Sequence, residues 1–309
     1  MAQHPMHVFA SFIMRSRMSA ILITGLFAAL SLLMPPLSQV SGAVIALVTL
    51  RLGAREGLFV TVGAGSAVGV LSWAILSSMP QGVVLILGAF VGSWIPVWIL
   101  AMVLRATRSV ETTLVAAAGL GISGVVIIHL WLGDATDWWR SILSETIRPA
   151  LENSGTTLGA GEIDNIIESV AGAMTGVVGA GFVAGLMTSL FIGRWWQSVL
   201  YNPGGFRAEF HALRIGRQLS MFTLVVTAIA TLAPANAAST ASDAMLVLIA
   251  AYMFGGVALM HAAVAARNGH VAWLIAMYLM LAFLLPQMAV VLAAAGFADS
   301  WMNLRKYFR

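Results

Sequence analysis

The charged residues of this chain are confined to short stretches between long uncharged runs. All 16 Lys and Arg and all 12 Asp and Glu lie outside nine such runs. A membrane-spanning helix needs about 20 apolar residues, and a charge at its centre costs about 2.5–3.5 kcal/mol. The pattern therefore predicts an all-α polytopic membrane protein, a compact bundle of about 8–10 transmembrane segments, some of them short or re-entrant. The runs are 18–34, 37–50, 57–79, 82–104, 112–133, 169–193, 218–234, 244–266 and 271–298.

We expect a single integral membrane domain over 1–309. Its parts are a proline hairpin at 18–50, three spans at 57–133, an outside amphipathic segment at 134–168, a glycine-ladder span at 169–193, a cytoplasmic loop helix in 194–217, C-terminal spans at 218–298 and a tail at 299–309. The hairpin turns at Pro35-Pro36 and is either a tilted pair of helices or a re-entrant loop. Pro286 lies near the middle of the last run, where a proline removes a helix hydrogen bond and predicts a kink or a turn.

The loops between the runs alternate in charge. Segments 1–17, 51–56, 105–111, 194–217 and 267–270 carry most of the arginines, whereas 134–168 carries most of the acids. The positive-inside rule therefore predicts that the N-terminus is cytoplasmic. If the chain folds back near Pro286, the basic C-terminal tail returns to the cytoplasm as well.

The composition argues against disulfides, nucleotide-binding loops and most catalytic sites. The chain has no cysteine, which excludes disulfides and thiolate sites, and its one lysine, Lys306, lies in the tail, so no phosphate-binding loop is present. The runs contain no carboxylate and two histidines, His129 and His261, which we interpret as interhelical hydrogen-bond partners rather than reactive groups. We expect no enzyme activity, no cofactor, no metal and no nucleic-acid binding.

Small residues recur every four positions in run 169–193. In lipid, helices associate where small side chains let the backbones approach. The ladder consists of Gly172, Gly176, Ala180 and Ala184. We expect it to pack the protein's own bundle; an end helix such as 18–34 is the alternative place for a partner subunit to dock.

The outside segment 134–168 has apolar residues at helical spacing after a pair of tryptophans. This pattern predicts an amphipathic helix at the membrane interface, which is either a connector resting on lipid or a lid over an outward-facing pocket. The candidate ligand-binding residues near this face are aromatic or polar: His129, Trp131, Trp138, Trp139 and Trp73.

The cytoplasmic segment 199–217 begins with a turn signal at Asn202-Pro203-Gly204-Gly205. A short helix after it places aromatic residues on one face and basic residues on the next. Such a helix can rest on anionic lipid or on another protein. The candidate docking residues are Phe206, Arg207, Phe210, His211 and Arg214.

Three stretches resemble the YybS-like family of predicted membrane proteins, domain of unknown function 2232. They are the Pro35-Pro36 hairpin leading into Leu50-Arg51-Leu52-Gly53, the loop Gly204-Gly205-Phe206-Arg207-Ala208-Glu209-Phe210, and the closing Ala298-Asp299-Ser300-Trp301. That family is grouped with the S components of energy-coupling-factor vitamin transporters and with the cell-shape protein MreD. The resemblance implies a bacterial cytoplasmic membrane and a helical bundle with a small-molecule cavity. The chain departs from S components in having more than six spans.

Two functions follow from these observations. The first is a substrate-binding or transport-type subunit that binds a small molecule and is energised by partner proteins. The second is a non-catalytic membrane scaffold that recruits a cell-envelope or cytoplasmic partner. In either case the expected partners are the lipid bilayer and a membrane or cytoplasmic protein.

Overall fold

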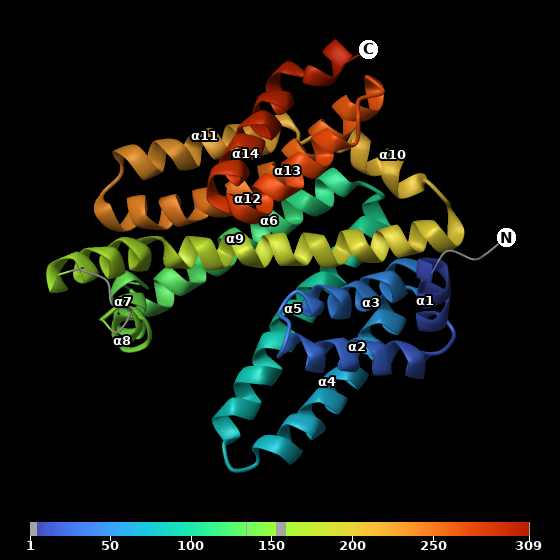
Figure 1. Ribbon diagram of the computed structural model, residues 1–309, viewed down its shortest axis with the longest axis horizontal. Helices are drawn as coiled ribbons and strands as arrows, with labels where there is room; N and C mark the ends of the chain where they lie inside the picture. The colour runs from blue at the N-terminus through green and yellow to red at the C-terminus, as the bar shows by residue number, and fades with distance from the viewer. Residues whose placement is uncertain (1–4, 134, 153–158, 309) are drawn as a thin grey trace. The chain divides into compact units, whose positions relative to one another are not determined.

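The computed structural model describes residues 5–133, 135–152 and 159–308, which form fourteen α-helices and one short 3₁₀ helix (Figure 1). Within these residues no strand occurs, and the prediction of an all-α membrane protein is confirmed. The chain divides into two compact units, Met1–Ala117 with Ala184–Leu213 and Ala118–Val183 with Arg214–Arg309. The helices α6 (Val110–Leu132) and α9 (Ala160–Tyr201) contribute residues to both units.

The first unit is built around one short, buried helix, α3 (Leu37–Leu52). The other helices that lie wholly in this unit are α1 (Pro5–Ile13), α2 (Arg17–Ser31), α4 (Ala54–Leu76), α5 (Pro80–Thr107) and α10 (Gly205–Ala212). Every residue of α3 from Ser41 to Leu50 is buried. The last turns of α9 cross α3 at glycines, since a Cβ on Gly42 would lie 2.7 Å from Ser189 Oγ and one on Gly193 would lie 2.7 Å from the carbonyl oxygen of Ala43. The central position of α3 explains why run 37–50 is apolar on all sides.

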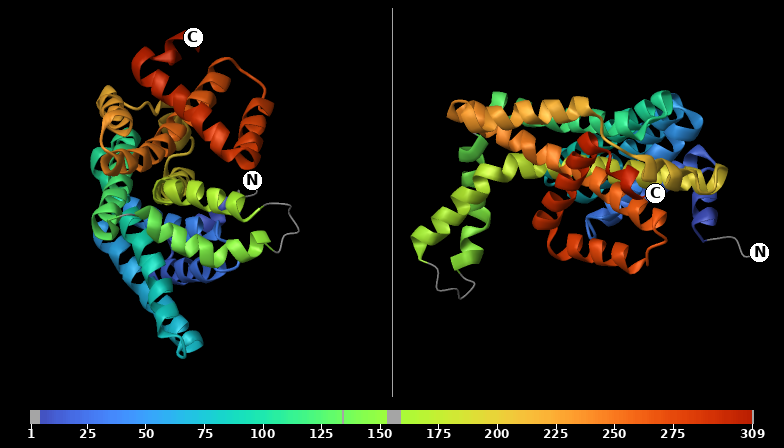
Figure 2. Two further views of the ribbon diagram at one scale, coloured as in Figure 1. Left: turned by 90° about the vertical axis from the view of Figure 1, so that its left-hand side faces the viewer. Right: turned by 90° about the horizontal axis from the view of Figure 1, so that it is seen from above.

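The helices α2 and α3 are joined by a turn at Pro35-Pro36. The helix α2 ends at Ser31, the chain turns through Pro35, and α3 begins directly after Pro36. Proline fits the first turn of a helix because its missing N–H has no partner there. The helices α2 and α3 pack against each other, as do α4 and α5, which form a hairpin (Figures 1 and 2).

The second unit contains α7 (Ala135–Thr146), α8 (Arg148–Glu152), α11 (Arg217–Leu232), α12 (Ala235–Ala266), α13 (Ala272–Phe283), α14 (Leu285–Met302) and η1 (Leu304–Phe308). The helix α12 is its most buried long helix and packs against both α11 and α14. The backbones of α12 and α14 meet at Gly256 and Gly296, where a Cβ on Gly256 would lie 2.0 Å from the carbonyl oxygen of Leu292. The predicted break near Pro286 is also found, because α13 ends at Phe283 and Pro286 lies in the first turn of α14.

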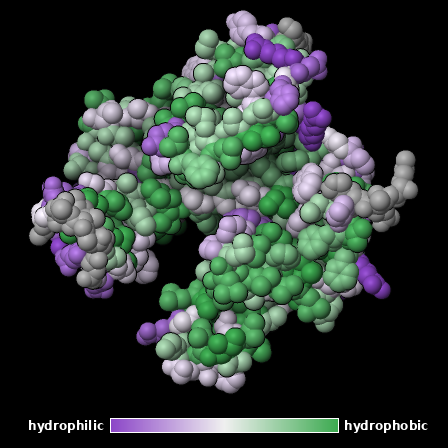
Figure 3. Space-filling view, in the orientation of Figure 1, coloured by the Kyte–Doolittle hydropathy of each residue, from purple (hydrophilic) through white to green (hydrophobic). Residues whose placement is uncertain are grey.

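Among the described residues, five helices are long and apolar enough to cross a membrane: Ala54–Leu76, Gln81–Thr107, Val110–Leu132, Gly161–Tyr201 and Ala235–Ala266. The number rises to seven if two bent helix pairs each count as one span. One of these pairs is α1 with α2, and the chain bends by 113° between them. Two shorter apolar helices, Leu37–Leu52 and Ala272–Phe283, accompany them. On the face shown in Figure 3, apolar residues cover most of the surface of the first unit, as expected for helices that face lipid.

The expected outside segment 134–168 is helical over most of its described part. It comprises α7, α8 and the first turns of α9, while residues 134 and 153–158 lie outside the described residues. The predicted amphipathic helix corresponds to α7 and α8, and the glycine-ladder span is the central part of the longer helix α9.

Candidate functional site

A pocket of about 770 Å³ opens in the second unit where α6 ends and α12 begins. The first two turns of α12 supply its hydrogen-bonding wall, and the last turn of α6 and the start of α7 supply the rest. Its lining residues are His129, Leu130, Gly133, Thr136, Ala235, Asn236, Ala237, Ser239 and Thr240. The described residues of the wall therefore offer amide, hydroxyl and imidazole groups and no carboxylate.

A buried carboxylate lies next to this wall. Asp243, on α12, is 3% exposed, and its Oδ2 lies 2.7 Å from Nε2 of His129, a pocket residue on α6. Its Oδ1 accepts a 3.0 Å hydrogen bond from the backbone N–H of Gly176 on α9. One side chain thus connects three helices. Removing the imidazole would leave Oδ2 of this buried carboxyl group without its partner, which costs about 1–3 kcal/mol.

Glycine at position 176 allows this approach. A Cβ on Gly176 would lie 2.7 Å from both Cα and Oδ1 of Asp243, closer than side chains pack. At Gly172, one turn earlier, a Cβ would meet nothing within 4 Å. Of the two ladder glycines, Gly176 is thus the one at a close crossing. Ala180 and Ala184 are half-buried. A second close crossing uses Gly179, which faces Gly121 of α6.

Asp243 belongs to the same helix as the uncharged run 244–266. The residues before that run, 235–243, are helical too, because α12 begins at Ala235, directly after Pro234. The sequence does carry a signal for this face. Asn236, Ser239 or Thr240, and Asp243 recur at the three- and four-residue spacing of one helix face.

The predicted ligand-binding residues are only partly brought together. His129 lines the pocket, and its side chain is 11% exposed. Trp139 packs edge-to-face on Trp138 and donates from Nε1 to Thr175 Oγ1 over 2.9 Å, which is a structural contact. Trp131 is 84% exposed and does not line the pocket. Trp73 lies on α4 in the first unit and is 65% exposed.

The helices α7 and α8 pack against the start of α9 and form ion pairs with it. Leu143 packs with Ile163, Ile167 and Ala171, and Trp139 and Leu151 flank this cluster. Arg140 donates to Glu168, with a 2.7 Å bond to Oε1, and Arg148 pairs with Asp164. The hydrogen bond to Glu168 is the main cause of the raised pKa of the Arg140 guanidinium. The amphipathic segment is thus held on α9 by both apolar packing and ion pairs.

Most predicted docking residues of 199–217 are used within the protein. In the first unit, Phe206 and Phe210 pack on the ring of Phe191, and Arg194 pairs with Glu209 beside them. In the second unit, Arg214 donates to the carbonyl oxygens of Asp299 and Ser300 over 2.9 and 3.0 Å. His211 is half-buried and also has an interaction partner, whereas Arg207 is exposed.

Within the described residues, no three His, Cys, Asp or Glu side chains gather as a metal site would require. Comparison of the chain with protein-family models, with curated proteins and with solved structures found no match.

Proposed function

We propose that this protein is the membrane-embedded binding subunit of a transport-type system and that its pocket beside α6 and α12 takes a small polar solute. The observation that carries this proposal is the buried Asp243–His129 pair at the pocket wall. Ionisable side chains within membrane helices are expensive, and they mark substrate or ion pathways more often than they serve packing.

The pocket has the size and chemistry of a ligand site. Its volume of about 770 Å³ falls within the range of about 300–1,000 Å³ that is usual for small-molecule sites. Asn236, Ser239 and Thr240 follow one another on one face of α12 and can both donate and accept hydrogen bonds. A solute rich in hydroxyl or amide groups fits this wall better than an apolar one.

His129 links the pocket to the buried carboxylate. Its Nε2 faces Asp243, which leaves Nδ1 as the second hydrogen-bonding atom of the ring. When Nε2–H donates to a carboxylate, Nδ1 of the neutral ring is an acceptor. We infer that Asp243 fixes the orientation of His129 and that His129 accepts a hydrogen bond from the solute.

Energy for transport would come from partner proteins. The chain has no phosphate-binding loop of its own, since its one lysine is Lys306. Its resemblance to the YybS-like family, and through it to S components, supports a role beside an energising partner in a bacterial cytoplasmic membrane. The N-terminus and the C-terminus would both be cytoplasmic, as the positive loops favour.

A scaffold role is the less supported alternative. It needs the aromatic and basic residues of 199–217 to be available to a partner. Phe206 and Phe210 instead pack on Phe191, and Arg214 binds backbone carbonyls of α14.

Binding can be tested by thermal unfolding of the purified protein with a panel of vitamins and lipid precursors. A solute at a hundredfold excess over its Kd stabilises the folded state by about 2.7 kcal/mol. We expect one solute class to raise the Tm of wild type, and Asn236→Ala to abolish the rise. Gln218→Ala removes an exposed amide of α11 that does not line the pocket, and this control should keep the rise. No rise with any solute, or an equal rise in Asn236→Ala, would count against the proposal.

A further inference from the structure

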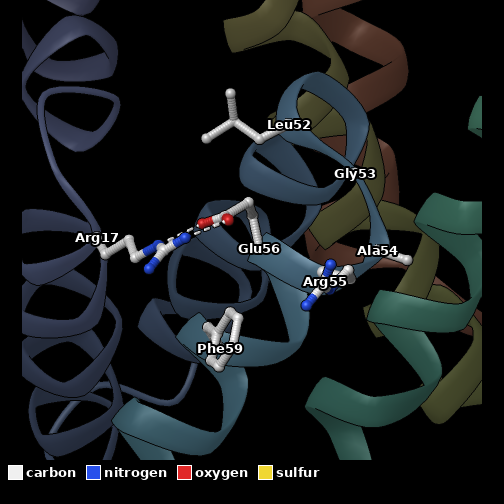
Figure 4. A pocket seen from close by; sticks show the side chains of 7 residues that line it. All are labelled: Arg17, Leu52, Gly53, Ala54, Arg55, Glu56 and Phe59. Atoms are coloured by element: carbon white, nitrogen blue, oxygen red, sulfur yellow. Dashed lines mark hydrogen bonds and ion pairs between the residues drawn. The ribbon is translucent and has the colours of Figure 1, made fainter.

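A second, smaller pocket lies in the first unit where α2 and α4 begin. Its volume is about 440 Å³ (Figure 4). The lining residues are Arg17, Leu52, Gly53, Ala54, Arg55, Glu56 and Phe59. Arg17 is the first residue of α2, and Arg55 and Glu56 belong to the first turn of α4, so two guanidinium groups and one carboxylate share the wall.

The charges of this wall do not cancel. Arg17 donates to both oxygens of Glu56, from Nε over 2.6 Å and from Nη2 over 2.5 Å. This pairing leaves Nη1 of Arg17 as a donor that Glu56 does not use. Arg55 is exposed, and no carboxylate of the described residues pairs with it. The wall therefore carries a net charge of about +1, provided by a guanidinium that is available to an anion.

The surroundings of the pocket are apolar. Leu52 and Phe59 line it and are each more than half exposed. Leu58 and Val62, also exposed, continue this surface along α4, which is one of the helices long enough to span a membrane. Charged groups at the start of a spanning helix, followed within two turns by an exposed apolar face, lie at the level where lipid headgroups meet acyl chains.

We propose that this pocket binds the phosphate of an anionic phospholipid. Arg55 and the remaining donors of Arg17 bind the phosphate oxygens, as guanidinium groups do in charge-assisted hydrogen bonds. Leu52 and Phe59 contact the glycerol and the first methylene groups of the chains. A singly charged phosphodiester matches the net charge of the wall, whereas a soluble phosphate compound would gain nothing from the exposed apolar side chains.

The test is lipid binding by the full-length protein in mild detergent, counted by native mass spectrometry. The probes are phosphatidylglycerol, zwitterionic phosphatidylcholine and water-soluble glycerol 3-phosphate. We expect phosphatidylglycerol to bind more tightly than either of the others. Arg55→Gln should weaken phosphatidylglycerol binding about fivefold, since one arginine near an anionic surface contributes about 1 kcal/mol. Phe59→Ala should weaken it as well.

The matched control is Arg15→Gln. Arg15 is exposed, lies just before α2 in the same unit and does not line the pocket, so it reports general attraction between the protein and an anionic surface. We expect less than a twofold effect. Equal losses in Arg55→Gln and Arg15→Gln would overturn the proposal. Binding of glycerol 3-phosphate as tight as that of phosphatidylglycerol would overturn the lipid assignment. Because Arg55 has no ion pair to lose, its variant should keep the wild-type Tm, which is measured on the same samples.

Discussion

The contact between Gly176 and Asp243 predicts that one added methyl group will separate α9 from α12. In Gly176→Ala, the new Cβ would lie 2.7 Å from Asp243 Cα and Oδ1 and 2.8 Å from Leu246 Cδ1. Two of these three atoms belong to Asp243, which lies next to the pocket wall. The Cα of Asp243 is part of the backbone, so it can move only if α12 moves. Overpacking of this kind costs about 1–3 kcal/mol. The 3.0 Å hydrogen bond from Gly176 N to Asp243 Oδ1 would lengthen with it.

Gly172→Ala serves as a control that separates the cost of the clash from the gain in helix propensity. Replacing glycine by alanine inside a helix also gains up to about 1 kcal/mol of helix propensity, which would mask part of the loss. Gly172 lies one turn earlier on the same helix and has open space around it, so Gly172→Ala gains the propensity without the clash. The difference between the two variants therefore reports the clash alone, about 1–3 kcal/mol.

The assay is unfolding of both variants and wild type in the same detergent, followed by the loss of helical circular dichroism. We expect the Tm to fall in the order Gly172→Ala, wild type, Gly176→Ala. The solute-induced rise in Tm should be weakened in Gly176→Ala alone, because Asp243 orients His129. A Gly176→Ala protein as stable as Gly172→Ala would refute the close crossing and the geometry of the pocket wall with it.

Three further variants test other contacts in the second unit by the same unfolding measurement. His129→Leu should cost about 1–3 kcal/mol, because Oδ2 of the buried Asp243 loses its hydrogen-bond partner. Adding Asp243→Leu should restore part of the loss, and a double variant less stable than the single one would contradict this. Arg214→Ala should lower the free energy of unfolding by about 1.5–3 kcal/mol, because it removes hydrogen bonds from a charged group to the end of α14. Its control, Arg207→Ala, changes an exposed residue and should stay within about 0.5 kcal/mol of wild type. Gly256→Ala should be the most harmful glycine substitution in α12, because its Cβ would lie 2.0 Å from a backbone oxygen, and a stable variant would argue against the crossing with α14.

Local features of the fold could be predicted from the sequence because their causes are local. Pro35-Pro36 and Pro286 remove helix hydrogen bonds wherever the chain goes, so the turn before α3 and the break before α14 followed from their positions. The apolar spacing after Trp138 similarly predicted the helical segment of α7 and α8, because a helix face depends on neighbours three and four residues away.

Uncharged runs and prolines act on their own segments, so membrane residence, the helical class and these chain breaks can be read from the sequence. Which polar residues matter depends on how the helices pack against one another. Asp243 and His129 are 114 positions apart, and nothing in either segment shows that their helices meet. Gly172 and Gly176 look alike in a four-residue ladder, yet only one faces another backbone. Whether a residue is buried, or lies close to another backbone, depends on which helix packs against it. That neighbouring helix is set by packing across the whole unit.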